Sequence, residues 1–351
     1  MTTHLPIPYD ELPLWMRQAR QEFDWSILIA LAMSIAIAWS FLLHDKLPAG
    51  HQLEHTVFQA SDIVTGFHEG RFYPRWSPYA VNGYGAPIPN YYPMGTPYII
   101  ATIETLFSNN LNQAVRITFI LTYAVAGLGI YLLVSRRTDA PIGLMSSVLY
   151  LYSPMIGSTV PYVMGDLALL MGGALLPLSL WSSYRLIKSK LRIDFVMHCL
   201  ILALFVWIHP QMAIISIIMS YGYALFDQPP KSRLQPIVRL TLAVVAGWLL
   251  VAFYWLPAIL EHNLVNWYPQ DSYVFPMLTL GQLVAPMQQI DSGLVMPQPQ
   301  FKLGWVIIAL IAVGIVTLYF AKSLPRRFYM ITAIAGILLL IIALVIVPAD
   351  V

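Results

Sequence analysis

Charged residues and cysteine are both scarce in this sequence. Asp, Glu, Lys and Arg supply only 10% of the 351 residues, whereas soluble globular domains average about 25% charged residues, so the composition excludes a soluble enzyme. The single cysteine, Cys199, allows no internal disulfide, and because it lies in an apolar run we expect it to pack rather than to react. The sequence also lacks a phosphate-binding loop, a serine nucleophile elbow, internal repeats and a nucleic-acid-binding face, so no nucleic-acid partner is expected.

Hydrophobic residues are abundant, at 58% of the chain, and the mean hydropathy is +0.68. They gather in runs that are mostly long enough to cross the roughly 30 Å hydrocarbon core of a bilayer as a helix. The sequence therefore predicts an all-α, polytopic transmembrane helical bundle. The nine expected spans cover residues 25–43, 112–135, 141–158, 164–184, 195–208, 210–226, 238–257, 303–321 and 328–347.

The basic residues are distributed unevenly about these spans. If residues 1–24 form a cytoplasmic tail, 14 of the 19 Lys and Arg residues lie in or beside cytoplasmic segments, which agrees with the positive-inside rule. The tail is polar and does not resemble a cleavable signal peptide. The apolar run 98–107 is too short to span and contains Glu104, so we expect a re-entrant or interfacial helix there.

This topology leaves two long segments on the outer side, at 44–111 and 258–302, around a six-helix core at 112–257 and two C-terminal spans within 303–351. Six of the eight histidines and ten of the 17 acids fall on the outer side. Membrane insertion requires short basic inner loops but does not require polar, aromatic outer loops. We therefore expect the functional residues on the outer side.

The first outer segment opens with an amphipathic pattern at 51–67, which predicts a surface helix lying on the membrane. The residues expected on its apolar face are Leu53, Val57, Ala60, Val64 and Phe67. The residues expected on its polar face are His51, His55, Gln59 and Asp62. Asp62 is therefore predicted to be solvated. The RFYPRW segment at 71–76 follows and brings two cations and three aromatic rings to the headgroup level.

Residues 77–97 (SPYAVNGYGAPIPNYYPMGTP) contain five prolines, three glycines and four tyrosines. Proline fixes φ and glycine permits positive φ, so this segment is expected to fold back as a specific loop. Aromatic faces with nearby acids suit sugars, and arginines at a membrane surface suit phosphates. The alternative is an interfacial belt of tyrosines that only anchors the chain.

Several segments resemble a family of bacterial integral membrane proteins, the 6-pyruvoyl-tetrahydropterin synthase-related family. The most specific are GRFYPRWSPYAVNGYGAPIPNYYP at 70–93 and AFYWLPAILE at 252–261. GDLALLMGGALLP at 165–177 and His209 at the outer end of a span agree with them. The family is similar in turn to YfhO-type proteins and to membrane glycosyltransferases of the GT-C fold. The resemblance covers about residues 25–262.

The resemblance implies a GT-C-like bundle in a bacterial plasma membrane that transfers a sugar from a polyprenyl-phosphate carrier to an outer-side acceptor. In that fold an acidic residue early in the first outer loop acts as the base, and cations hold the donor phosphate. The chain departs from the family pattern at Gln52 and Thr56, near which the pattern has Asp and His. Either the acid has moved or the site is inactive. The three-histidine metal site of the soluble pterin synthase is lacking.

Glu54 is the leading candidate for the catalytic base, because a carboxylate at a low-dielectric boundary can acquire the raised pKa that proton transfer requires. Asp45 and Asp166 are the other catalytic candidates. Asp45 can instead pair with Lys46, and Asp166 can instead cap the following helix. The residues expected to bind substrate are His55, Arg71, Arg75, Tyr84, Tyr91, Tyr92, His209 and Glu261.

No metal site is predicted, because His51, His55 and Asp62 have no further ligand at a recognised spacing. A divalent cation bound by Glu54 or Asp45 is left open as a cofactor. The expected partners of a transferase are membrane lipids and a polyprenyl-phosphate-linked sugar.

Two other functions are compatible with the sequence. The first is a non-catalytic subunit with a degenerate GT-C fold that binds lipid or other membrane protein subunits, and the two replaced family positions favour it. The second is a transporter, which nine spans would suit, although broken helices in paired halves are not evident.

Overall fold

The computed structural model describes residues 24–44, 46–48, 50, 52–189, 191–226 and 233–265. Within these residues the regular structure is helical, apart from one antiparallel bridge between Ser77 and Ala86, so the predicted all-α class is confirmed. Asp45, His51 and the predicted spans at 303–321 and 328–347 lie outside the described residues.

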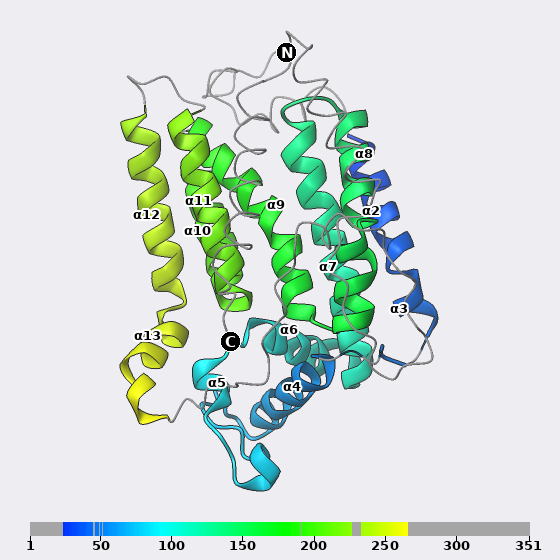
Figure 1. The fold of residues 1–351 in the computed structure, drawn as a ribbon, viewed down its shortest axis with the longest axis vertical. Coiled ribbons are helices and arrows are strands. Elements are labelled where there is room, and N and C mark those ends of the chain that lie inside the picture. The colour runs from blue at the N-terminus through cyan, green and yellow to red at the C-terminus, as the bar shows by residue number, and fades with distance from the viewer. Residues whose placement is uncertain are drawn as a thin grey trace, which may run out of the picture.

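Long helices lie side by side and form a bundle (Figure 1). They are α2 (Ser26–Ile37) with its short continuation α3 (Trp39–Leu43), α7 (Leu111–Ser135), α8 (Ala140–Leu151), α9 (Leu167–Lys188), α10 (Arg192–Ile208), α11 (Pro210–Phe226) and α12 (Leu234–Leu250). Helix α9 is central, because it packs against α7, α10, α11 and α12. Helices therefore occupy the positions of the first seven predicted spans.

Fewer of the described helices are long and apolar enough to span a membrane than the sequence predicted. Among the described residues, α7 and α9 are long and apolar enough to cross a membrane, and α12 with α13 (Ala252–Leu260) makes a third if this bent pair is one span. Helices α2 and α11 are apolar but shorter. The span predicted at 141–158 is interrupted, since α8 ends at Leu151 and the π-helix η4 (Met155–Met164) follows.

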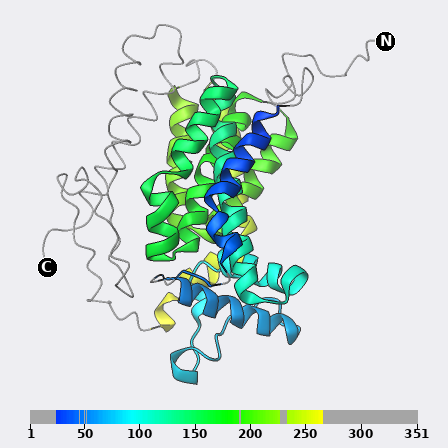
Figure 2. The ribbon, with the colours of Figure 1, turned by 90° about the vertical axis from the view of Figure 1, so that its right-hand side faces the viewer.

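Short helices cover one end of the bundle, which we call the cleft end. They are α4 (Leu53–His68), α5 (Ile88–Tyr91), α6 (Gly95–Ile103) and α13. Helix α4 lies across the bundle (Figure 2), and α6 packs against both α4 and α7. Helix α6 continues into a π-helical turn, η3 (Glu104–Ser108), so the run at 98–107 is a short helix as expected. The opposite end, where α7 and α9 finish, is called the basic end.

The surface helix predicted at 51–67 is present as α4, but part of its predicted polar face is wrong. Leu53 and Ala60 are buried as expected, whereas Gln59 and Asp62 are buried as well. The reason is that α4 has two packing partners. Helix α6 covers one side, and the chain that turns back after Gly66 covers another.

Proline breaks the backbone hydrogen bonding of α9 at Pro177, because proline has no amide hydrogen to donate to the carbonyl four residues earlier. That carbonyl belongs to Gly173, and the Tyr150 hydroxyl of α8 donates to it over 2.7 Å. A tyrosine from a neighbouring helix therefore replaces the missing backbone donor. Such replacement matters in an apolar bundle, where an unsatisfied carbonyl costs several kcal/mol in the extreme case.

The π-helix η4 repeats this arrangement. Its hydrogen bonds run five residues back, so Pro161 leaves the carbonyl of Ile156 without a donor. The Tyr123 hydroxyl of α7 donates to that carbonyl over 3.1 Å. The tyrosines thus offset the prolines at two places in the bundle.

Replacement of Tyr150 by phenylalanine should lower the free energy of unfolding by about 1–3 kcal/mol, because the Gly173 carbonyl loses its donor. Pro177→Ala restores a backbone donor, so the cost of Tyr150→Phe should fall towards zero in that background. Unfolding in mild detergent measures all four proteins of this cycle. Tyr152→Phe, at a tyrosine that is 51% exposed, is the matched control. An equal cost of Tyr150→Phe in both backgrounds would contradict the prediction.

Candidate functional site

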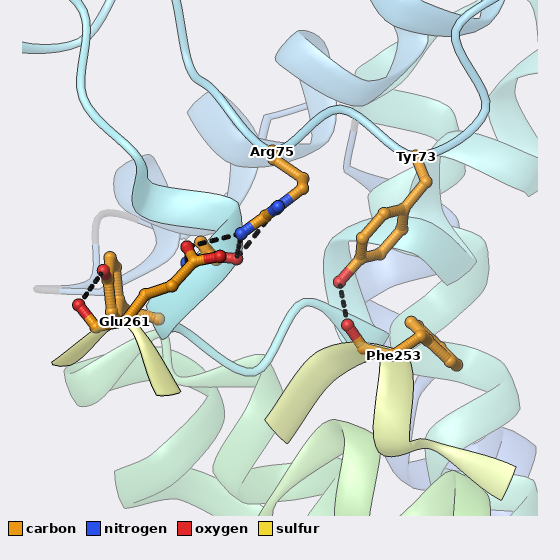
Figure 3. Close-up of polar contacts among 6 residues, drawn as sticks. Tyr73, Arg75, Phe253 and Glu261 are labelled. Carbon is orange, nitrogen blue, oxygen red and sulfur yellow. Dashed lines mark hydrogen bonds and ion pairs between the residues drawn. The ribbon is translucent and has the colours of Figure 1, made fainter. Parts of the chain in front are cut away.

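Three polar side chains from distant segments meet at the cleft end (Figure 3). Arg75 donates from Nε and Nη2 to Asn90 Oδ1 over 3.0 and 2.8 Å, and its Nη2 lies 2.5 Å from Glu261 Oε2. Asn90 Nδ2 donates to the same carboxylate oxygen over 3.0 Å. The RFYPRW segment, helix α5 and the residue that follows α13 are therefore joined by one network.

The ion pair alters the proton affinity of both partners. The hydrogen bond from Arg75 holds the pKa of Glu261 below its usual range, and the same bond raises the pKa of Arg75. Glu261 is consequently ionised at neutral pH and is a weak base. The side chains are 48% and 36% exposed, so solvent screens the pair and its net contribution to stability is small.

The network lies in the wall of an open cleft of about 330 Å³. The lining residues are Arg75, Trp76, Pro87, Asn90, Tyr91, Glu261, Leu264 and Val265. This volume is at the lower end of the roughly 300–1,000 Å³ range of small-molecule sites. The wall combines two aromatic rings with a guanidinium, an amide and a carboxylate.

A sharp bend brings α13 to the cleft. Helices α12 and α13 meet at 74°, which turns the AFYWLPAILE segment across the bundle end. Within α13, Pro257 leaves the carbonyl of Phe253 without its helical donor, and the Tyr73 hydroxyl donates to it over 3.2 Å (Figure 3). The Tyr91 hydroxyl donates to the Glu261 carbonyl over 2.9 Å. The two segments that carry the family resemblance are thus held against each other.

Residues 77–86 form a hairpin, which we call the flap, beyond α4 (Figure 1). Gly85 has φ +79°, and a Cβ there would lie 2.3 Å from Trp76 Nε1, so only glycine lets the flap pack on this ring. Tyr84 is 86% exposed in the flap and does not line the cleft. Tyr84 and Tyr91 were both predicted to line a sugar path, but in the structure Tyr91 lines the cleft and Tyr84 does not.

Glu54 and His55 lie in the first turn of α4 and are exposed. The His55 ring meets the Tyr92 ring edge-on with 5.8 Å between centroids, and His55 Nε2 lies 2.9 Å from Gln59 Nε2. Tyr92 follows Tyr91 directly, so this group is close in sequence to the cleft wall. Glu54, His55 and Tyr92 are not among the lining residues of the cleft, so the predicted base shares the cleft end of the bundle with Tyr91 but not the cleft wall.

The two arginines predicted to hold phosphate are both paired with acids. Arg71 pairs with Glu69, and both side chains are about half exposed. Arg75 pairs with Glu261. Among the described residues of the cleft wall, the one cation thus faces the one carboxylate, and no surplus positive charge is left there.

Asp166 and His209 cap helices. Asp166 Oδ1 accepts a hydrogen bond from Leu169 N over 2.8 Å at the start of α9, and His209 Nδ1 accepts one from Met212 N over 3.4 Å at the start of α11. The two side chains are near enough to interact electrostatically. They do not line the cleft. The capping alternative therefore accounts for the position of Asp166.

Asp62 was predicted to be solvated, and this is wrong, because the residue is only 6% exposed. Its carboxyl group lies against the Ser77 hydroxyl at the base of the flap. Burial raises the pKa of Asp62, and the nearby Ser77 hydroxyl partly opposes that shift. Asp62 is a contact between α4 and the flap rather than a polar group in solvent.

Because the pKa of Asp62 is raised in the folded protein, ionisation of this residue lowers the stability of the fold. Above its unfolded pKa of about 3.8 the unfolded chain releases this proton while the folded chain keeps it, so stability falls as pH rises through the folded pKa. Asp62→Asn removes this fall and should gain stability relative to the unmodified protein between pH 4 and neutrality. Thermal unfolding at several pH values measures the difference, with Glu69→Gln as the exposed control. A difference that does not depend on pH would contradict the assignment.

Sequence reasoning missed Trp76 and Asn90 as cleft residues. Both residues lie inside the 70–93 segment that carries the family resemblance, but the motif did not show what either side chain does. Asn90 is 3% exposed, and its importance follows from contacts with residues 15 and 171 positions away. Spacing along the chain could not indicate those contacts.

Within the described part of the chain, no three His, Cys, Asp or Glu side chains are grouped so that they could hold a metal ion. The free cysteine Cys199 is buried, and its thiol donates to the Ala243 carbonyl at 3.6 Å. The prediction that this cysteine packs in the bundle is confirmed.

The fold and the cleft define an all-α membrane protein with a candidate small-molecule site at one end of its helical bundle. The chain matches the family described as the 6-pyruvoyl-tetrahydropterin synthase related domain, a membrane protein, over residues 89–349. The chain belongs to this family, and the predicted family is confirmed. The match begins at residue 89, so it does not include most of the 70–93 segment on which the resemblance was based. Neither the comparison with curated proteins nor the comparison with solved structures gives a match.

Proposed function

We propose that this protein is a GT-C-like glycosyltransferase of the bacterial plasma membrane, which moves a sugar from a polyprenyl-phosphate carrier to an outer-side acceptor. One observation carries the proposal. The two segments with the most specific family resemblance fold together into a cleft that is lined by Trp76, Tyr91, Arg75, Asn90 and Glu261. In the proposed topology the N-terminus is cytoplasmic and the cleft end faces outward.

The chemistry of the cleft wall suits a sugar. A sugar ring has an apolar face of C–H groups, which can stack on Trp76 or Tyr91, and hydroxyl groups at its edge. Asn90 offers both a donor and an acceptor, Arg75 offers donors, and the Glu261 carboxylate offers acceptors. Because the Arg75–Glu261 pair is neutral as a unit, the cleft favours the neutral sugar over the phosphate of the donor.

In the proposed reaction an acceptor hydroxyl oxygen attacks the anomeric carbon of the donor sugar. The bond from that carbon to the phosphate oxygen breaks, and polyprenyl phosphate leaves with the electron pair. Glu54 takes the proton of the acceptor hydroxyl. Glu261 is a poor base because its pKa is lowered, so its role is to accept a hydrogen bond from a sugar hydroxyl. A divalent cation at Glu54 is left open.

The test is sugar transfer by the purified full chain from polyprenyl-phosphate-linked hexose to added glycan acceptors. Trp76→Ala should raise the KM for the donor about tenfold or more, because the sugar loses a stacking surface. Glu261→Gln should act in the same direction. Trp39→Ala removes a tryptophan of similar exposure, 54% against 51%, away from the cleft and should leave transfer unchanged. Equal transfer by all these proteins would refute a sugar site in the cleft.

A second candidate is a non-catalytic membrane subunit with the same fold. It is favoured by the pairing of Arg71 with Glu69 and of Arg75 with Glu261, which neutralises both arginines that were predicted to hold the donor phosphate. This candidate predicts a partner chain that co-purifies with the protein and a lack of transfer with any polyprenyl-phosphate sugar.

A further inference from the structure

The two ends of the flap stand in the wall of the cleft. Trp76, which lines the cleft, directly precedes Ser77 at one end. Pro87, which also lines the cleft, directly follows Ala86 at the other end. Ser77 N donates to Ala86 O over 2.8 Å, and Ala86 N donates back to Ser77 O over 3.0 Å. These two bonds hold the ends together, so the flap and this part of the cleft wall form one unit.

The chain on either side of Trp76 is fixed. Before it, the Arg75 guanidinium is bound to Asn90, and after it, Ser77 is fully buried. The Trp76 side chain is different, because it is 51% exposed. A half-exposed indole can turn about its two side-chain torsions, so the direction of this ring depends on the contacts that it makes.

Gly85 makes such a contact. A Cβ on Gly85 would lie 2.3 Å from Trp76 Nε1, 2.7 Å from Cε2 and 2.9 Å from Cζ2. Favourable contacts between such atoms are about 3.5–4.0 Å long, so the Gly85 backbone lies directly against this side of the indole. A side chain at position 85 would occupy the place of the ring. Because the ring ends a flexible side chain, it would turn away more readily than the backbone would shift.

Backbone bonds within the flap bring Gly85 to the ring. Asn82 and Gly83 both have positive φ, 57° and 90°, and an Asn-Gly pair of this kind reverses the chain tightly. The Ala80 carbonyl accepts hydrogen bonds from Gly83 N over 3.2 Å and from Gly85 N over 2.9 Å. Residues 76–103 include no charged side chain. Packing and backbone bonds, rather than ion pairs, therefore set the shape of the flap.

We propose that the flap is a positioning element, in which Gly85 fixes the direction of the Trp76 ring and with it the stacking surface that the cleft offers to a sugar. Gly85 does not line the cleft and acts through Trp76, so it is a positioning residue. This role rests on the proposed sugar site. Stacking requires the ring to face the apolar side of the sugar, and a ring already held in that direction loses less side-chain entropy when the sugar binds.

The test compares two glycines of the flap in the full chain, purified in mild detergent. Gly85→Ala should raise the KM for polyprenyl-phosphate-linked hexose about three- to tenfold, because the sugar loses stacking surface, and should change kcat less than about twofold. Gly83 is the matched control. It also has positive φ, 90° against 79°, but a Cβ there meets no atom within 4 Å. Gly83→Ala shares the backbone strain and should change the KM less than about twofold.

A double-mutant cycle tests whether Gly85 acts through Trp76. Phenylalanine is shorter than tryptophan and lacks the Nε1 edge that meets Gly85. In the Trp76→Phe background, Gly85→Ala should therefore have no further effect on the KM, although it raises the KM of the unmodified protein. An equal rise in both backgrounds would overturn a role of Gly85 through the ring.

A second readout does not depend on sugar transfer. The fluorescence of Trp76 is obtained as the difference between each protein and the same protein with Trp76→Phe. Gly85→Ala should shift the emission maximum of this difference and change its quenching by acrylamide, because the ring leaves the flap backbone. Gly83→Ala should leave both unchanged.

The two readouts separate the role of the flap from the proposed function. A change in Trp76 fluorescence specific to Gly85→Ala, without sugar transfer by any of these proteins, would refute the transferase and keep Gly85 as the residue that positions the ring. An unchanged signal in Gly85→Ala would overturn that role whether or not sugar is transferred. An equal change in Gly83→Ala would overturn it as well, because strain in the flap rather than contact with the ring would then be the cause.

Discussion

Glu54→Gln is expected to lower the rate of sugar transfer by about 10²–10⁴-fold, the usual contribution of a general base. The amide cannot take the proton of the acceptor hydroxyl, whereas its size and hydrogen bonding change little. Because Glu54 is exposed in the first turn of α4, the substitution should leave the fold and the donor affinity intact. The measurement is the initial rate with polyprenyl-phosphate-linked sugar, together with the unfolding temperature.

Two control variants make this result specific. Glu69→Gln neutralises another exposed acid, directly after α4, and should not change the rate. Asp166→Ser keeps a side-chain oxygen that can cap α9 and should not change it either, because Asp166 is assigned to capping. A normal rate in Glu54→Gln would remove this residue as the base. A large loss in Asp166→Ser would move the catalytic assignment to Asp166.

Asp194→Asn is expected to lower the free energy of unfolding by about 3–5 kcal/mol, because it leaves the Arg185 guanidinium buried without its carboxylate. The effect should appear as a large drop in the unfolding temperature of the detergent-solubilised protein.

The matched control is the exposed pair of Arg71 and Glu69, whose side chains are 53% and 52% exposed. Glu69→Gln should cost less than about 1 kcal/mol, because solvent screens that pair. Simultaneous replacement of Arg185 by Met and Asp194 by Leu should recover most of the stability, since neither buried charge remains. A cost of Asp194→Asn no larger than that of Glu69→Gln would show that the buried pair does not support the fold.

Sequence patterns predicted the helices well. Hydrophobic runs of about 20 residues placed α7 and α9, and helical periodicity placed α4, because both signals come from residues close together in the chain. The run at 98–107 was identified as a short helix from its length and from the presence of Glu104. Burial within α4 was harder to predict. Asp62 is buried because α6 and the flap cover two sides of the helix, and periodicity predicts a single buried face.

The sequence also did not predict that tyrosine hydroxyls bind the carbonyls that lose their helical donor to a proline. In the 77–97 segment the prolines and tyrosines were interpreted as a folded-back loop, with an interfacial belt of tyrosines as the alternative. The structure instead places tyrosine hydroxyls on carbonyls that prolines deprive of their donors, at Gly173, Ile156 and Phe253. Each tyrosine comes from a different element from the carbonyl that it serves. No spacing rule within a helix can predict such a bond.

The sequence by itself determined the all-α class, the apolar helices, the family and the segments that build the cleft, because composition, periodicity and motifs are local properties. Only the tertiary structure decided which residues of those segments contact each other and how the contacts change their charge and pKa. The Arg75–Glu261 pair joins residues 186 positions apart, and it both lowers the pKa of the carboxylate and cancels the charge of the arginine. Charge balance at a site depends on distances in space, and the chain sets those distances only when α13 bends back onto the first loop.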